Sequence, residues 1–97
     1  MARPPRLPAD AVSAALADLP RWSGDEHGIE RTAELPSFRA AVDAIVAIAA
    51  VAEEMDHHPD IDLRWHTLRI AVVTHSAGGV TEMDLALARR VDALLPG

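Results

Sequence analysis

A long stretch of apolar residues at helical spacing constrains this chain more than any other feature of its sequence. Ser37 follows a proline and is a good N-cap for a helix from Phe38 to about Met55. The main apolar stripe of that helix comprises Phe38, Ala41, Val42, Ile45, Ile48, Ala49 and Ala52. The opposite face is apolar too, with Ala40, Ala44, Val46, Ala47, Ala50 and Val51. A helix that is apolar nearly all round is buried on more than one side.

The chain is too short to surround such a helix by itself. It has 97 residues, of which 49% are hydrophobic and 25% charged, and these values are typical of one small folded domain. We therefore expect one face of the helix to pack on a sheet and the other on a partner subunit. The sequence predicts a homodimer or homotetramer formed through helix 38–55.

The other segments predict a sheet with helices on one side. Alternating apolar residues indicate strands, and helical spacing with Pro20 or with the capping residue Thr81 indicates two more helices. In chain order we expect a helix over 8–19, an extended piece at 21–23, strands over 29–35, 61–65 and 67–74, and a last helix after Thr81. The order α-β-β-α-β-β-α predicts an α+β single domain, a four-stranded antiparallel sheet with three helices packed on one face.

The ends and the composition limit where the protein works and what it binds. The proline-rich residues 1–8 are predicted to be a disordered tail before a domain at 9–97, and they lack a secretory apolar run, so we expect a cytoplasmic protein. The longest uncharged run, Ala44 to Ala52, is too short to cross a membrane. A net charge of −6 argues against direct nucleic-acid binding. The absence of Cys and Lys excludes thiolate and Schiff-base chemistry.

Three histidines are candidates for proton transfer. His57 and His58 follow the long helix, and His75 leaves the fourth strand at the loop before the last helix. In this topology the end of the long helix and the end of the fourth strand can lie close together. Imidazole both gives and takes a proton near neutral pH. Glu53 lies four residues before His57, and a carboxylate in that place orients the ring and raises its basicity.

Each of these residues also has an ordinary structural explanation. A His pair suits a helix C-terminus, His75 can be an exposed loop residue, and an acidic run such as Glu53 to Asp56 is usually a solvated turn. Tryptophans such as Trp22 and Trp65 are more often core residues, and Asp84 is more often a helix cap. Zinc is disfavoured, because zinc helices place His at both i and i+4, whereas Glu53 and His57 hold those positions here.

The polar residues together carry a specific pattern. Glu53-x-x-x-His57-His58-Pro59 is followed by Trp65, His75 and Asp84 at fixed spacing over 32 residues. This pattern resembles the signature of the pterin-4a-carbinolamine dehydratases, and the position of Trp22 and the helix start at Phe38 fit as well. Trp65 stands where Tyr or Phe is commoner in that family.

The resemblance implies a dehydratase that removes water from 4a-hydroxytetrahydropterin to give the quinonoid dihydropterin, in tetrahydropterin recycling. It implies that neither a metal nor an organic cofactor is needed, and that the partner is a small-molecule pterin. The residues implied for catalysis are His57, His75 and His58; those for substrate binding are His58, Pro59, Trp22 and Asp84. Glu53 has a supporting role, and we expect it to hold His57 in one tautomer.

A second function class stays open. Some relatives of this family act as a dimerisation cofactor for a transcription factor, and others assist assembly of a carbon-fixing enzyme. The outer face of helix 38–55 could serve such a non-catalytic protein-binding or assembly factor on the same scaffold. The presence of His57, His58 and His75 together favours catalysis, because a purely structural relative has no need of all three.

Overall fold

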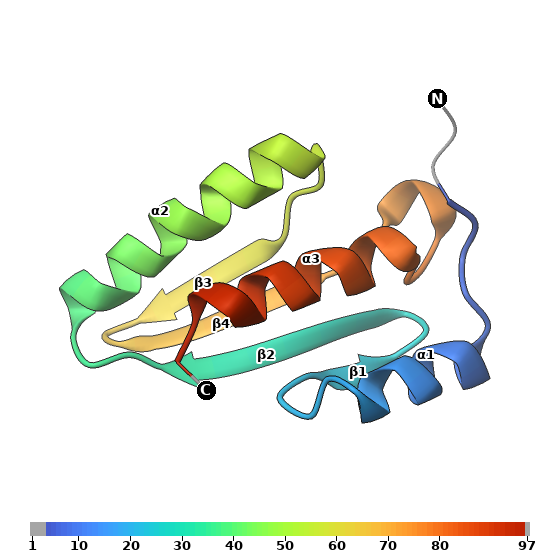
Figure 1. The fold of residues 1–97 in the computed structure, drawn as a ribbon, viewed down its shortest axis with the longest axis horizontal. Helices are drawn as coiled ribbons and strands as arrows, with labels where there is room; N and C mark the ends of the chain where they lie inside the picture. Colours follow the sequence, from blue (N-terminus) through green and yellow to red (C-terminus); the bar gives the residue numbers. More distant parts are fainter. Residues whose placement is uncertain (1–3, 97) are drawn as a thin grey trace.

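The computed structural model of the chain describes residues 4–96 and confirms the predicted order of elements (Figure 1). The elements are α1 (Ala9–Ala17), β1 (Ser23–Asp25), β2 (Gly28–Glu34), α2 (Phe38–Met55), β3 (Asp60–Arg64), β4 (Thr67–Val72), a short 3-10 turn η1 (His75–Ala77) and α3 (Glu82–Leu94). Within this part of the chain no helix is long and apolar enough to cross a membrane, α2 included.

The four strands form one antiparallel sheet in the order β1-β2-β4-β3. The long strands β2 and β4 lie in the centre, with Ile29 opposite Val72 and Glu34 opposite Thr67. Since β3 pairs with the other side of β4, α2 has to carry the chain from the end of β2 to the far edge of the sheet. This connection brings the C-terminal end of α2 close to the end of β4, where the histidines lie.

One hydrophobic core fills the space between the sheet and the three helices, and the predicted α+β fold is confirmed. Ile29 of β2 and Ile70 of β4 face this core, where they meet Val12 of α1, Ile48 of α2 and Leu87 of α3. The opposite face of the sheet is polar. There, for example, Arg69 pairs with Glu30, and the Thr67 hydroxyl donates to Glu34.

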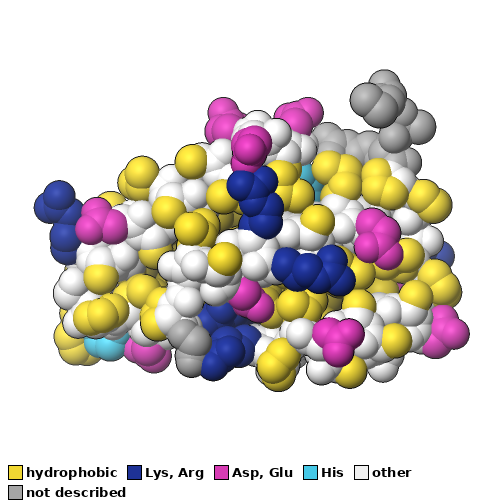
Figure 2. All heavy atoms as spheres, in the orientation of Figure 1, with side chains coloured by type: hydrophobic (Ala, Val, Ile, Leu, Met, Phe, Trp, Pro, Cys, Tyr) yellow, Lys and Arg dark blue, Asp and Glu magenta, His cyan; other side chains and the backbone are white. Residues whose placement is uncertain are grey.

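Helix α2 turns a different side to the core than its sequence predicted. Ala41, Ile48 and Ala52 are buried as expected, but Phe38 is 55% exposed and Ala49 is exposed. Residues assigned to the outer face, among them Ala40, Ala44 and Val51, pack against the core instead. Helix α3 contacts α2, and the alanine-rich side of α2 faces the core that the helices share. The outer side then carries Phe38, Val46, Ala49 and Ala50, and Figure 2 shows hydrophobic side chains along this part of the surface.

The prediction that Trp65 belongs to the third strand is wrong. The pairing of Arg64 with Thr67 leaves only Trp65 and His66 to connect β3 to β4. Such a short hairpin turn needs a residue with positive φ, and Trp65 is that residue, with a φ of 54°. Its side chain is 75% exposed and meets the His66 ring edge-on, with centroids 4.1 Å apart.

A buried arginine explains where Trp22 lies. Arg31 of β2 points towards the core and is only 3% exposed, a costly position for a cation without partners. Its Nη1 lies 2.6 Å from the Asp92 carboxylate of α3, and its Nη2 donates to the Pro96 carbonyl at 2.6 Å. The Trp22 indole N–H donates to the same Asp92 at 2.8 Å. Trp22 therefore belongs to a polar cluster at the C-terminal end of α3.

The segment before α1 makes defined contacts with the domain. Leu7 donates its backbone N–H to the Val80 carbonyl at 2.8 Å, and its side chain packs against the core. Pro8 is the N-cap residue of α1. The sequence predicted a tail over residues 1–8. Its first three residues lie outside the described part of the chain, and Arg6 and Leu7 already contact the domain.

Candidate active site

The chain conformation at the end of α2 directs the His57 side chain towards the interior of the molecule. Asp56 follows the helix in the left-handed conformation, with φ 50° and ψ 45°. The Asp56 N–H bonds to the Glu53 carbonyl, and the His57 N–H bonds to the Ala52 carbonyl at 3.0 Å. This pair of bonds is a Schellman motif, in which an aspartate takes the position usually held by glycine. The motif reverses the chain, so that His57 is buried beside the helix that it follows.

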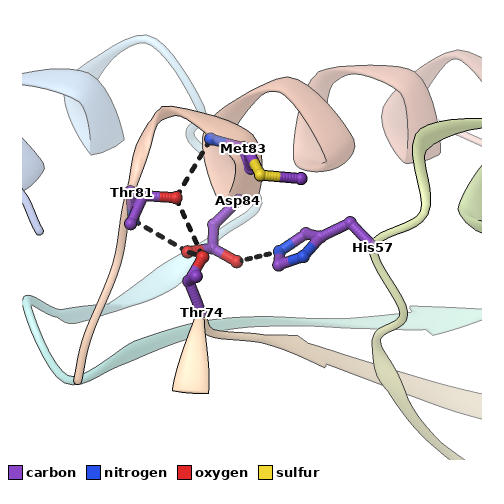
Figure 3. Close-up of polar contacts among 5 residues, drawn as sticks. All are labelled: His57, Thr74, Thr81, Met83 and Asp84. Atoms are coloured by element: carbon purple, nitrogen blue, oxygen red, sulfur yellow. Dashed lines mark hydrogen bonds and ion pairs between the residues drawn. The ribbon is translucent and has the colours of Figure 1, made fainter. Parts of the chain in front are cut away.

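His57 makes a short contact with Asp84 of α3. The Nε2 atom of His57 lies 2.5 Å from Oδ1 of Asp84 (Figure 3). His57 is 6% exposed and Asp84 is fully buried, so the pair is shielded from solvent and from salt. The contact joins the C-terminal end of α2 to the first turn of α3, two places that are 27 residues apart in the sequence.

The second oxygen of Asp84 is held by the N-terminus of its own helix and by the end of the sheet. Oδ2 accepts from the Thr81 N–H at 2.8 Å, which completes the predicted capping box, and from the Thr74 hydroxyl at 2.8 Å. The Thr81 hydroxyl lies 2.8 Å from that of Thr74 and accepts from the Met83 N–H (Figure 3). The carboxylate therefore has a partner at each oxygen, as a buried charge requires.

This hydrogen-bonding pattern predicts the tautomer of His57. A carboxylate only accepts hydrogen bonds, so Nε2 of His57 carries the proton in the contact with Asp84. In a neutral imidazole the other nitrogen, Nδ1, then has a free lone pair. A carboxylate in this position also stabilises the imidazolium formed when Nδ1 takes up a proton, which is the way the aspartate acts in a Ser-His-Asp triad.

Glu53 orients a different histidine than the sequence predicted. Its Oε2 lies 2.5 Å from Nε2 of His58, and both side chains are exposed. The expectation that Glu53 holds His57 is corrected by this geometry. The i+4 spacing suggested His57, but the helix ends at Met55 and the left-handed Asp56 turns His57 inwards. His58, one residue further on, points towards the carboxylate on the surface.

A hollow of about 310 Å³ lies between the end of α2 and the end of β4. It is lined by Asp56, His57, His58, Val73, Thr74, His75 and Ser76. The three predicted histidines therefore meet at one hollow, with Asp84 behind His57. His75 is exposed at the start of η1, and no side-chain partner is found for it among residues 4–96.

Four of the seven predicted site residues do not line this hollow: Glu53, Asp84, Pro59 and Trp22. Asp84 was predicted to bind substrate, but it is fully buried with both oxygens bonded within the protein, so it acts through His57 instead. Pro59 follows His58 in the chain and is partly buried, but it is not part of the lining. Trp22 lies with Asp92 in the polar cluster at the other end of α3. Two threonines were missed. Thr81 was predicted as a helix cap, and the segment from Thr74 to Thr81 fits the family resemblance, but the pattern does not indicate that both side chains surround Asp84.

The described residues contain one group of side chains close enough to share a metal ion, and it lies elsewhere. Asp25, Glu26 and His27 bring their ligand atoms within 4.8 Å of one another in the turn between β1 and β2. None of the three lines the hollow. Exposed acidic groups of this kind are common on proteins without a metal, so the trio gives no support to a metal-dependent reaction.

The fold and the hollow together define a class: a small α+β domain with three histidines at one surface hollow. Comparison with known proteins gives the family. The family model described as pterin 4 alpha carbinolamine dehydratase matches residues 5–94. The chain belongs to this family, and the resemblance carried by its histidine pattern is confirmed.

Similar proteins match over nearly their full length. A Mycolicibacterium smegmatis protein with the provisional name pterin-4-alpha-carbinolamine dehydratase is 45% identical over 89 residues, which are 92% of this chain and 95% of that protein. A Mycobacterium tuberculosis protein with the same name is 46% identical over 91% of this chain and 94% of its own length.

Two solved structures share the fold. The transcriptional coactivator/pterin dehydratase from Brucella melitensis superposes with a TM-score of 0.89 and 30% identity, over 94% of this chain and 99% of that one. A pterin dehydratase-like protein identified as a RuBisCO assembly factor in the alpha-carboxysome has a TM-score of 0.63 and 27% identity, over 76% of this chain and 86% of that one.

Removing one hydroxyl from the Asp84 network should destabilise the protein. Thr74→Val keeps the shape of the side chain but removes a donor to a fully buried carboxylate. We expect a loss of about 1–3 kcal/mol in the free energy of unfolding, measured by urea denaturation. The control is Thr32→Val on the exposed face of β2, which should change this value by less than about 0.5 kcal/mol. Equal effects of the two changes would contradict the network.

Proposed function

We propose that this protein removes water from 4a-hydroxytetrahydropterin to give the quinonoid dihydropterin, by histidine acid–base catalysis and in tetrahydropterin recycling. Membership of the family makes the protein a dehydratase. The single observation that carries the finer proposal is the hollow lined by His57, His58 and His75, with His57 bonded through Nε2 to the buried Asp84.

The reaction requires a proton to be given and a proton to be taken. The 4a-hydroxyl is a poor leaving group as hydroxide but leaves as water once an acid protonates it, while the N5 lone pair forms the new C=N bond. Loss of a ring N–H proton to a base then gives the quinonoid dihydropterin. One proton is supplied and one removed, so the net change is the loss of one water molecule. General acid and base groups accelerate such steps by about 10²–10⁴-fold each.

The geometry supports different roles for the histidines. His57 has its Nε2 committed to Asp84, which leaves Nδ1 to take the ring proton, and the carboxylate then stabilises the imidazolium. His75 comes from a separate element, and its ring is free to give a proton to the 4a-hydroxyl. His58 is held by Glu53 at the rim, where its ring would hold the substrate. Histidines on separate elements could serve both faces of C4a.

Removing either proton-transfer histidine should abolish most of the acceleration. We expect His57→Ala and His75→Ala each to lower kcat by about 10²–10⁴-fold with little change in thermal stability for the exposed His75. The measurement follows the ultraviolet absorbance of freshly generated 4a-hydroxytetrahydropterin. The control is His27→Ala in the turn between β1 and β2, which should keep full activity. A well-folded wild type that gives no acceleration would overturn the proposal.

The outer side of α2 supports a further role in association. Phe38 is 55% exposed and Val46 is 64% exposed, and the helix has no charged residue between Asp43 and Glu53. A helix surface of this kind packs against another protein surface more favourably than it faces water. We propose that two copies of the chain pair through it as a homodimer or, with a second contact, a homotetramer. The same surface is the observation that favours the second candidate, a non-catalytic binding or assembly factor.

A charge on this surface should separate the copies. Val46→Glu buries no new group in the monomer, because the side chain is 64% exposed, but it would bring like charges together across a symmetric helix pair. We expect the mass measured by sedimentation equilibrium to fall to that of the 10.4 kDa monomer. Ala14→Glu on the exposed side of α1 is the matched control and should keep the wild-type mass. If Val46→Glu leaves an oligomer intact, or the wild type is already monomeric, association through α2 is wrong.

A further inference from the structure

A second hollow lies directly beside the candidate active site. It has a volume of about 370 Å³ and is lined by Pro4, Pro5, Arg6, Ser76 and Ala77. Ser76 lines both hollows, so the two meet at the turn η1. Figure 1 shows the chain before α1 running past this turn. One wall of the second hollow is therefore made by the segment that precedes the first helix.

This segment is fixed against the loop that follows His75. Leu7 is bonded to Val80, and the side-chain carbons of Arg6 lie on Gly79. A Cβ atom at Gly79 would come within 2.6 Å of Cδ of Arg6 and 2.5 Å of the Glu26 carbonyl oxygen. Both distances are too short for any side chain there, so the glycine is what allows Arg6 to lie so close to the loop.

The guanidinium of Arg6 is a free cation at this place. Most arginines of the described chain pair with a carboxylate: Arg31, Arg39, Arg64, Arg69 and Arg90. Within residues 4–96 Arg6 has no hydrogen bond or ion pair, although acidic residues outnumber basic ones by 15 to 9 in the whole chain. A guanidinium offers a planar set of donors that fits a carboxylate or a phosphate.

We infer that the second hollow receives the side chain at C6 of the pterin, and that Arg6 binds an anionic group carried by that side chain. The inference rests on the proposed function, since it assumes that the pterin ring occupies the hollow of the histidines. That hollow, at about 310 Å³, lies at the lower end of the range for small-molecule sites. A pterin with an extended substituent therefore needs further space, and the adjoining hollow at Ser76 offers it together with a positive charge.

Binding of pterins that differ only in the C6 side chain tests this inference. The probes are 6-hydroxymethyl-7,8-dihydropterin, which is neutral there, its pyrophosphate ester, and 7,8-dihydrofolate, whose side chain ends in carboxylates. Isothermal titration calorimetry gives Kd for the wild type, for Arg6→Gln and for Arg89→Gln. Arg89 is the matched control, because it is exposed on α3, has no partner within residues 4–96 and lines neither hollow.

We expect the wild type and Arg89→Gln to bind at least one anionic probe about tenfold more tightly than the alcohol, a difference of about 1.4 kcal/mol. Arg6→Gln should lose this preference and keep its affinity for the alcohol. Tighter binding of the pyrophosphate ester would indicate a site for phosphate, and tighter binding of 7,8-dihydrofolate would indicate a site for carboxylate. Equal affinity for all three probes in the wild type, or an undiminished preference in Arg6→Gln, would overturn the inference and leave the dehydratase proposal intact. If no pterin binds at all, both fail.

Discussion

The contact between Asp84 and His57 is the interaction on which the rest of the molecule depends. Asp84 is fully buried, and its two oxygens bind the end of α2, the end of β4 and the first turn of α3. A buried carboxylate without such partners would cost several kcal/mol. His57 and Thr74 therefore stabilise the fold, and the same hydrogen bonds that close the domain set the proton position on the histidine.

The order of the elements could be predicted from the sequence because period-2 and helical patterns are local. The partners of side chains could not, since they depend on contacts between distant elements. Glu53 was assigned to His57 on helical spacing, but the left-handed Asp56 ends that spacing one residue too early. Trp22 matched a family position, but no local pattern indicated that Asp92, which also pairs with Arg31, would bind it at the other end of α3. Trp65 fitted a strand by alternation and lies in the turn, because the register of β3 on β4 decides where the strand ends.

The histidine hollow and the apolar outer side of α2 are separate surfaces of the domain. The histidine hollow lies at the end of the sheet where α2 ends and α3 begins, while the apolar side of α2 faces away from the core. A change on one of these surfaces need not affect the other. This separation gives a physical reason why proteins of one fold can include both dehydratases and assembly factors, since the outer side of α2 can differ without disturbing the histidine hollow.

The most direct test of this account is the position of the proton on His57. A long-range ¹H–¹⁵N correlation spectrum of the labelled protein at about pH 9, above the ordinary imidazole pKa, distinguishes a protonated from an unprotonated nitrogen in the neutral rings. His57→Ala assigns the signals. The account predicts a proton on Nε2 and none on Nδ1. In Asp84→Asn the amide oxygen is needed to accept from the Thr81 N–H and the Thr74 hydroxyl, so the NH2 group faces Nε2 and the proton should move to Nδ1. A proton on Nδ1 in the wild type, or rapid exchange between tautomers as expected for the exposed His27, would contradict it.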